Sequence, residues 1–402
     1  MTEPVLIVGG SMGALRTAES LRKAGYAGPI RVIGEEPHPP YNRPPLSKDV
    51  LAEVVNHEAV AFQARPATAD VEWVLGARAT GLDLDAHTVR TADGHDHPYR
   101  ALVIATGLRA RRLPVDPLPG RHVIRTLDDA IALREELVPG ARIVVVGSGF
   151  IGCEVAATAT KLGCSVTVVS PSTAPMAAAL REPLASEVRR RHEAHGVRFL
   201  VGRSVVGVTG TERVETVVLD DGTALDADVV IEAIGSIVND EWLAGSGLDI
   251  ADGVLTDGAL RATTEDGVVL DDVYAVGDIA RFPNPMFDDV PRRIEHWNIP
   301  TETGRRIGAV LGAWLADDGS FPEVAGQRFA PMPSFWSNQF DVALQAYGMP
   351  SLADPDGVRI LTGDLAGDVI VGYFRGDRLV GVVGLGPKGP LVPYRERIAN
   401  GG

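Results

Sequence analysis

Two glycine-rich turns constrain the fold of this chain more than any other feature. The first spans Gly9 to Ala14 and follows the apolar run Val5–Val8; the second spans Gly147 to Gly152 and follows Ile143–Val146. Each run predicts a buried strand, and the segment after each turn is compatible with a helix. Backbone N–H groups and the positive end of a helix then meet where a pyrophosphate can bind. One such turn would indicate one nucleotide site, whereas two indicate two dinucleotides between which electrons pass.

The first turn departs from the usual G-x-G-x-x-G pattern, because Ser11 stands where a second glycine is expected. Serine is small and its hydroxyl can donate to a phosphate, and Ala14 is an accepted third member of the pattern. Glu35 and Glu36 follow the next predicted strand, where a carboxylate can bind ribose hydroxyls. The alternative for either glutamate is a solvated loop charge.

The second turn is a complete G-x-G-x-x-G, and its nucleotide preference stays open. Ser170 ends the following predicted strand at the position where an NAD site usually carries a carboxylate. No arginine or lysine follows before Arg181 to attract the 2′-phosphate of NADPH. The sequence therefore predicts NADH or NADPH as electron donor without choosing between them.

Composition excludes several classes of protein. The chain has 402 residues, enough for two or three domains, and a formal charge of −15 that argues against a nucleic-acid partner. It shows no apolar run long enough to span a membrane and no signal peptide, so we expect a cytoplasmic protein without a membrane partner. Cys153 and Cys164 fit neither a metal site nor a redox pair. They are most simply core residues, and the redox chemistry then belongs to bound cofactors.

A rigid loop separates the first predicted βαβ unit from the rest. Five prolines fall between Pro37 and Lys48, which excludes a regular helix or a central strand. Such a loop either holds a ligand or forms a structural corner.

Several segments together carry a resemblance to a known family. They are Gly9–Ala14, Gly34–Lys48, Ala105–Gly107, Arg125–Asp129, Gly147–Glu154, Tyr274–Asp278, Ile294–Trp297 and Phe335–Gln339. In this order they resemble the FAD-dependent ferredoxin reductases of the putidaredoxin reductase type, which serve cytochromes P450 and Rieske oxygenases. That group lies in the pyridine nucleotide-disulfide oxidoreductase superfamily but lacks the redox disulfide. A more distant resemblance is to apoptosis-inducing factor.

The resemblance implies an α/β fold with two Rossmann-like domains and a C-terminal α+β domain. We expect a discontinuous FAD domain at 1–110 and 240–318, a NAD(P) domain at 111–239, and a C-terminal domain at 319–402. We further expect either a monomer or a homodimer.

The resemblance also implies a set of cofactor-binding residues. Those implied for FAD are Gly9, Gly10, Ser11, Met12, Gly13, Ala14, Glu35, Glu36, Arg43, Lys48, Ala79, Ala105, Thr106, Gly107, Arg125, Gly277 and Asp278. Beside the isoalloxazine we expect Glu295, His296, Trp297 and Trp336. Those implied for the nicotinamide nucleotide are Gly149, Ile151, Gly152 and Gly235. Further implied cofactor-binding residues are Gly147, Phe150, Glu154 and Ser170.

Lys48 and Glu154 are the implied catalytic pair. The resemblance implies that they meet near the flavin N5, where the lysine can stabilise a reduced, anionic flavin by its charge. The alternative is an ordinary buried ion pair that only fixes the loop.

A small iron–sulfur ferredoxin is the expected electron acceptor, since no thiol pair is present to take electrons from the flavin. An acidic ferredoxin would need a local basic patch on this acidic chain. The candidates are Arg292 and Arg293, Arg305 and Arg306, and the cluster Arg109, Arg111 and Arg112, each of which can equally be a solvated surface charge. Two other functions stay open: an NAD(P)H oxidase or small-molecule reductase, and a redox-gated interaction protein.

Overall fold

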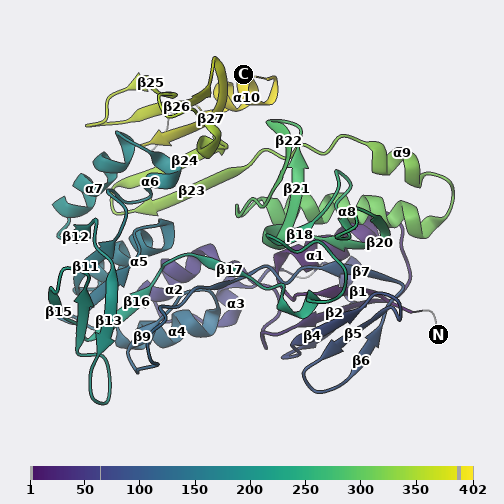
Figure 1. Ribbon diagram of the computed structural model, residues 1–402, viewed down its shortest axis with the longest axis horizontal. Helices are drawn as coiled ribbons and strands as arrows, with labels where there is room; N and C mark the ends of the chain where they lie inside the picture. The colour runs from purple at the N-terminus through teal and green to yellow at the C-terminus, as the bar shows by residue number, and fades with distance from the viewer. Residues whose placement is uncertain (1–2, 64, 387–390, 402) are drawn as a thin grey trace. The chain divides into compact units, whose positions relative to one another are not determined.

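The computed structural model describes residues 3–63, 65–386 and 391–401, and its chain divides into two compact units. The first unit comprises residues 1–42, 57–109 and 238–333, and the second comprises 43–56, 110–237 and 334–402. Each unit is therefore assembled from separate stretches of the chain. Figure 1 shows the elements by label, and each unit is described by itself.

The first unit is built on a six-stranded sheet. Its strands, in spatial order, are β19 (Arg261–Thr263), β20 (Val269–Ala275), β7 (Ala101–Ile104), β1 (Val5–Val8), β2 (Ile30–Gly34) and β3 (Glu72–Leu75). All neighbours are parallel except β19 and β20. The strands β1 and β7 are buried along their whole length, as expected for a parallel sheet covered on both faces.

Two smaller sheets and several helices complete the first unit. The sheets are β4 (Ala79–Asp83), β5 (Thr88–Thr91) and β6 (Asp96–Pro98), and β18 (Val254–Leu255), β21 (Ala280–Asn284) and β22 (Asp288–Arg292). The helices are α1 (Met12–Lys23), α3 (His57–Val60), α8 (Ile299–Ala316) and α9 (Phe321–Gly326), with 3₁₀ turns η2 (Pro66–Thr68), η3 (Glu241–Leu243) and η4 (Gly277–Ile279).

Helix α8 packs closely on α1 because three glycines four residues apart line its contact face. A Cβ atom on Gly308 would lie 2.3 Å from the Cβ of Ser20, and one on Gly312 would lie 2.6 Å from the Cβ of Ala24. Larger side chains would push the two helices apart. The contact holds α1, which follows the first glycine-rich turn, against the C-terminal part of this unit.

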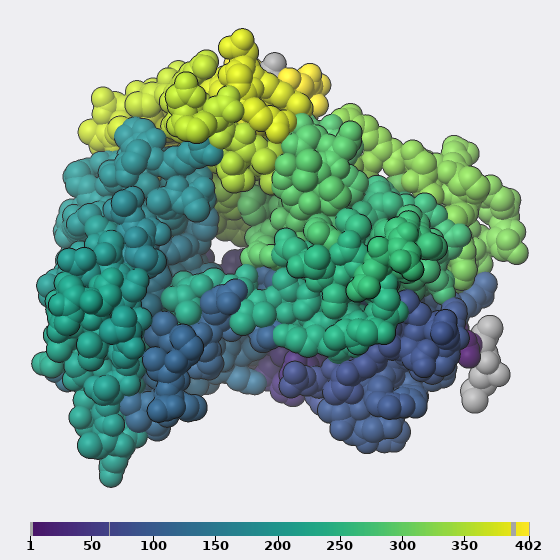
Figure 2. All heavy atoms as spheres, viewed as in Figure 1, coloured from purple at the N-terminus to yellow at the C-terminus, as the bar shows by residue number. Residues whose placement is uncertain are grey.

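The second unit contains a five-stranded parallel sheet. Its strands, in spatial order, are β12 (Arg198–Val201), β11 (Ser165–Ser170), β10 (Arg142–Val146), β16 (Val229–Glu232) and β9 (Arg121–His122). An antiparallel sheet accompanies it, formed by β13 (Val205–Thr209), β14 (Thr216–Leu219) and β15 (Ala224–Asp226). The hairpin between β13 and β14 projects from this unit (Figure 2).

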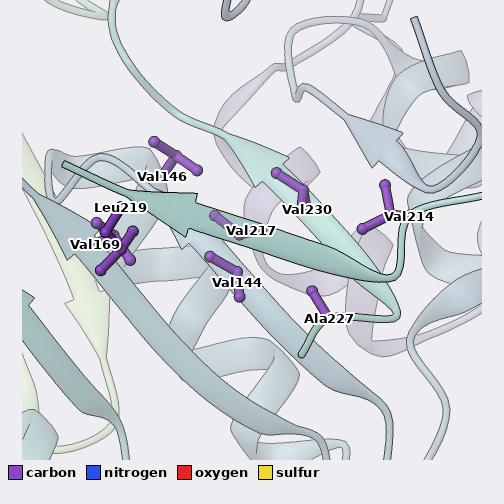
Figure 3. Close-up of a cluster of buried hydrophobic side chains, with 8 residues drawn as sticks. All are labelled: Val144, Val146, Val169, Val214, Val217, Leu219, Ala227 and Val230. Carbon is purple, nitrogen blue, oxygen red and sulfur yellow. The ribbon is translucent and has the colours of Figure 1, made fainter. Parts of the chain in front are cut away.

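The two sheets enclose an aliphatic core. Eight side chains form it: Val144, Val146, Val169, Val214, Val217, Leu219, Ala227 and Val230. Figure 3 shows the side chains of β14 facing those of β10 and β16. A fully buried valine contributes about 1.5–3 kcal/mol, so this cluster holds the antiparallel sheet on one face of the parallel one.

The C-terminal part of the second unit is a five-stranded antiparallel sheet. Its strands are β23 (Ser334–Gln339), β24 (Val342–Gly348), β27 (Arg378–Leu385), β26 (Val369–Arg375) and β25 (Val358–Gly363). Helices of this unit are α2 (Asp49–Ala52), α4 (Leu127–Glu136), α5 (Phe150–Lys161), α6 (Ala177–Leu180), α7 (Leu184–Ala194) and α10 (Val392–Ala399), with turns η1 (Pro44–Ser47) and η5 (Pro350–Leu352). Strand β23 runs beside α5 (Figure 1).

The chain crosses between the units through β8 (Leu108–Ala110) and β17 (Ser236–Val238), among other segments. No helix within the described part of the chain is both long enough and apolar enough to cross a bilayer. The domain boundaries expected from the sequence stay a prediction.

Candidate functional site

The first glycine-rich turn lies between β1 and α1, and its backbone passes very close to the backbone of Ala105. Gly9 adopts a φ of +121°, and a Cβ on it would lie 2.1 Å from the carbonyl oxygen of Ala105. Only glycine is tolerated there. Ser11 is the N-cap of α1, and its side chain makes no capping hydrogen bond. Its hydroxyl and the first N–H groups of α1 therefore fit a phosphate.

The two acidic residues after β2 have different surroundings. The hydroxyl of Tyr41 donates to Glu36 Oε2 over 2.5 Å, while Glu35 is exposed with its Oε1 3.8 Å from Arg78 Nε. Glu36 is thus oriented by its neighbour and Glu35 is a loosely paired surface charge. Both remain candidates for ribose binding.

Two further turns of the first unit are tied down by hydrogen bonds. Thr106 Oγ1 donates to the carbonyl of Asn239 over 2.7 Å, and Asn239 Nδ2 donates to the carbonyl of Thr106 over 2.9 Å. At the start of η4, the N–H of Gly277 donates to Thr303 Oγ1 over 3.1 Å. The predicted residues Ala105, Gly107 and Asp278 lie in these same turns, and Ala79 begins β4.

The segment before α8 contains three predicted residues. Arg293 forms an ion pair with Glu295 at 2.8 Å, and Trp297 Nε1 donates to Asn42 Oδ1 over 2.9 Å. Burial lowers the pKa of His296 to about 4, against a smaller opposite effect of Glu295. The imidazole of His296 is therefore neutral at pH 7.

The second glycine-rich turn lies between β10 and α5 in the second unit. Gly147 has a φ of +101°, and a Cβ on it would lie 2.2 Å from the carbonyl oxygen of Ala233. Gly149 is the N-cap of α5, and beyond its chain neighbours and its own helix no atom of the described residues lies within 4 Å of the position its Cβ would take. This open space beside the helix N-terminus fits a dinucleotide phosphate. Ile151, in the first turn of α5, is 43% exposed.

Ser170 and Arg181 both already make hydrogen bonds within the protein. Ser170 is buried, and its Oγ accepts hydrogen bonds from Ser148 Oγ at 2.9 Å and from the N–H of Ser172 at 3.2 Å. The guanidinium of Arg181 donates to the carbonyls of Ala353 and Asp354 at 2.8 and 2.7 Å. Arg181 therefore anchors the C-terminal part of this unit.

Lys48 and Glu154 lie in the same unit and are in direct contact. Lys48 Nζ is 2.6 Å from Glu154 Oε2, and their side chains are 21% and 5% exposed. The hydroxyl of Ser47 donates to Oε2 and that of Ser337 donates to Oε1, each over 2.5 Å. The sequence predicted that the lysine and the glutamate meet, but it assigned no role to either serine.

Other predicted site residues also lie in the second unit. Arg43 Nη1 donates to the carbonyl of Arg125 over 2.5 Å. The ring of Phe150 lies 4.9 Å from that of Phe335, the neighbour of Trp336, which is 41% exposed. Gly235 has a φ of +98° and open space beside it. Their roles as cofactor ligands stay predictions.

Both cysteines are buried free thiols. Burial raises the pKa of Cys153, and more weakly that of Cys164, which disfavours the reactive thiolate. Cys153 lies in α5, and its Sγ donates weakly to the carbonyl of Ser148 at 3.5 Å.

Most of the arginines considered for ferredoxin docking are already paired. Arg292 pairs with Asp288, Arg305 with Glu302, and Arg109 with Glu241. Arg306 is a correction: it is only 8% exposed and donates to the carbonyls of Val324, Ala325 and Gln327, so it cannot belong to a surface patch. It ties α8 to α9.

Sequence reasoning missed the polar residues that are hydrogen-bonded to Glu154 directly or through one another. They are Ser47, Ser337, Gln339 and His192. The signal that could have found two of them is the alternation in β23, where Ser337 and Gln339 are buried while Trp336 and Asn338 are exposed. Two polar residues on the buried face of a strand need partners in the core.

Comparison with known proteins defines the class of this molecule. Residues 3–304 match the pyridine nucleotide-disulphide oxidoreductase family, and residues 334–402 match the reductase C-terminal family. A ferredoxin–NAD(+) reductase component of the anthranilate 1,2-dioxygenase system from Burkholderia cepacia is 35% identical over 97% of this chain and 89% of its own length. Putidaredoxin reductase from Pseudomonas putida is 34% identical over 94% of this chain and 87% of its own.

A solved structure agrees with these sequence matches. The covalent putidaredoxin reductase–putidaredoxin complex contains a chain that superposes with a TM-score of 0.89 at 30% identity, covering 99% of this chain and 93% of that one. The fold class expected from the sequence, with two Rossmann-like domains and a C-terminal domain, is confirmed.

Two conclusions follow from the fold, the two nucleotide turns and these matches. The molecule is a two-dinucleotide oxidoreductase. The chain belongs to the pyridine nucleotide-disulphide oxidoreductase family, in the branch that carries the reductase C-terminal domain. Its cofactors are FAD and a nicotinamide nucleotide.

Proposed function

We propose that this protein is a ferredoxin reductase that takes electrons from NAD(P)H through FAD and passes them singly to a small iron–sulfur ferredoxin. The proposal includes service to a cytochrome P450 or a Rieske oxygenase. The observation that carries it is that no pair of cysteines can take electrons from the flavin. The only cysteines of the sequence, Cys153 and Cys164, are buried free thiols with raised pKa values. The names of the relatives support the same acceptor.

In this proposal the first unit holds most of the FAD. The turn Gly9–Ala14 binds the pyrophosphate, and Glu35 or Glu36 binds the ribose. The residues around Thr106, Gly277 and His296 contact the remaining parts of the cofactor. The Ser11 hydroxyl, which makes no capping hydrogen bond to α1, and the glycine-only geometry at Gly9 support the pyrophosphate assignment.

The turn Gly147–Gly152 binds the nicotinamide nucleotide. When bound, FAD accepts a hydride and releases electrons one at a time. The helix N-terminus at Gly149 positions the nucleotide phosphates, and the open space beside the Gly149 Cα among the described residues supports this assignment. Lys48 stabilises negative charge on the cofactor, and Glu154 fixes the lysine ammonium by a contact of 2.6 Å. Neutral His296 adds no charge to the site at pH 7.

The donor nucleotide is NADH or NADPH. The buried Ser170 supplies no carboxylate to repel a 2′-phosphate, and the guanidinium of Arg181 is already bonded to backbone carbonyls. A cytoplasmic location is part of the proposal, because both cysteines are free thiols of the kind that a reducing compartment preserves.

Docking of an acidic ferredoxin would have to use arginines whose positive charge is not already offset by a neighbouring carboxylate. Arg112 is exposed and has no ion-pair partner among the residues that the structure describes. The guanidinium of Arg111, also exposed, donates to the carbonyl of Ser236 at 3.1 Å, and no carboxylate of the described residues is paired with it. These two are therefore better candidates than the paired Arg292 and Arg305.

Cytochrome c reduction tests the proposed acceptor. The FAD-loaded protein with NADH or NADPH is assayed with and without an added putidaredoxin-type ferredoxin. Reduction that depends on the ferredoxin supports the proposal. Equal reduction without it, with oxygen uptake, would instead support an oxidase or a small-molecule reductase. Nucleotide-dependent oligomerisation without turnover would support an interaction protein.

A further inference from the structure

Glu154 belongs to a buried chain of hydrogen bonds that extends to another helix of the same unit. Ser337 Oγ lies 2.5 Å from Glu154 Oε1, Gln339 Nε2 lies 2.8 Å from Ser337 Oγ, and His192 Nε2 lies 2.7 Å from Gln339 Oε1. The members come from α5, β23 and α7. None of these four residues is more than 5% exposed.

The hydrogen bonds of this network all run in one donor-to-acceptor direction. Gln339 uses its amide N–H₂ on Ser337, so its carbonyl oxygen faces His192, whose Nε2 must carry the proton. Burial lowers the pKa of His192, in keeping with a neutral ring. Ser337 accepts from Gln339 and therefore donates its own hydrogen to Glu154. Every bond thus points toward the carboxylate.

The same carboxylate receives two more donors on its other oxygen. Ser47 Oγ and Lys48 Nζ lie 2.5 and 2.6 Å from Oε2. Ser47 is itself held, because Thr158, one turn after Glu154 on α5, donates to its carbonyl over 3.0 Å. Both oxygens are engaged, so the carboxylate cannot rotate without breaking a bond in a nearly dry environment.

We propose that Ser337 and Gln339 are positioning residues: they orient Glu154 and, through it, hold the Lys48 ammonium for the flavin. This rests on the proposed function, because it assumes that Lys48 acts on bound FAD. It adds that two residues of β23, in the C-terminal sheet, influence the reduction potential of the flavin although neither is among the predicted cofactor-binding residues. A merely structural polar core would stabilise the unit without affecting the flavin.

The variants remove single hydrogen bonds with little change of shape. Ser337→Ala removes the donor to Glu154, and Gln339→Met removes the donor to Ser337. Gln345→Met is the matched control, since Gln345 lies on the neighbouring strand β24, is exposed, and its side chain donates to the hydroxyl of Tyr347 over 3.2 Å. Gln339→Met is also the fallback if Ser337→Ala yields no folded protein, because it leaves every contact of Glu154 in place.

The two-electron reduction potential of the bound flavin is the readout. Losing Ser337 leaves the glutamate charge less neutralised and the lysine less fixed, and both effects disfavour a reduced, anionic flavin. We expect the equilibrium constant for flavin reduction to fall about tenfold in Ser337→Ala, which is about 30 mV toward negative values for a two-electron couple. Gln339→Met gives a smaller shift of the same sign, and Gln345→Met gives none.

The double variant separates positioning from simple stability. Gln339 acts through Ser337, so adding Gln339→Met to Ser337→Ala should not shift the potential further, although it lowers thermal stability. An unchanged potential in Ser337→Ala, or additive shifts in the double variant, would overturn the inference. If the wild-type protein binds no FAD or is not reduced by NAD(P)H, the proposed function itself fails. Failure of the proposed function and failure of the positioning role are therefore distinguishable.

Discussion

Replacing Lys48 by methionine isolates the contribution of the Lys48–Glu154 contact. At 2.6 Å and an effective dielectric constant of about 20, the attraction between the two charges is about 6 kcal/mol before desolvation is subtracted. Breaking a buried pair from one side costs about 3–5 kcal/mol, because the remaining charge loses its partner. Glu154 keeps two hydroxyl donors, from Ser47 and Ser337, so we expect the lower end, about 3 kcal/mol.

Thermal unfolding of the cofactor-free protein measures this cost. In a unit of about 200 residues, 3 kcal/mol lowers the Tm by about 6–12 °C. Lys161→Met is the control, since Lys161 ends the same helix, is exposed, and its ammonium lies 5.6 Å from the centre of the Phe340 ring. Its cost should stay below about 1 kcal/mol. If Lys48→Met lowers the Tm no more than Lys161→Met does, the ion pair does not stabilise the unit and the reasoning is refuted.

Three further predictions follow from the pKa values and contacts. Arg181→Met should leave the KM for NADPH unchanged within about twofold while lowering stability, because Arg181 binds backbone carbonyls; a large rise in KM would instead make it a phosphate ligand. His296, with its pKa lowered to about 4, should not titrate between pH 5 and 8 in ¹H–¹⁵N spectra. Since the unfolded chain takes up this proton first, below about pH 6.5, His296 should make the protein less stable as the pH falls from about 6.5 toward 4; a titration midpoint near 6.5 would contradict this. Cys153 and Cys164 should react with a thiol reagent only after denaturation, and rapid labelling with loss of turnover would revive a thiol mechanism.

The features that could be predicted from the sequence are those that a short local pattern determines. Both glycine-rich turns were recognisable because a strand, a positive-φ glycine and a helix follow one another within about ten residues, as at Gly9 and Gly147. The meeting of Lys48 and Glu154 was predicted through the family resemblance. It could not have come from spacing, since the two residues are far apart in the chain.

The missed features depend on tertiary contacts. Ser337 bonds to a glutamate 183 positions earlier, and nothing local to β23 identifies its partner. Arg306 looks like a surface charge in the sequence, yet its guanidinium is buried against the carbonyls of Val324, Ala325 and Gln327 at the C-terminal end of α9. The glycines Gly308 and Gly312 do carry a local signal, because small residues four apart on a helix allow close packing, and that signal went unused.

Anaerobic titration of the FAD-loaded protein tests the central claim most directly. NADH and NADPH are added in turn while the visible flavin band is followed, and oxidised ferredoxin is then added. The account predicts rapid bleaching by at least one nucleotide and recovery of the band with about two ferredoxin equivalents per flavin, since each carries one electron. A flavin that neither nucleotide reduces would contradict the account, as would a reduced flavin that ferredoxin does not reoxidise.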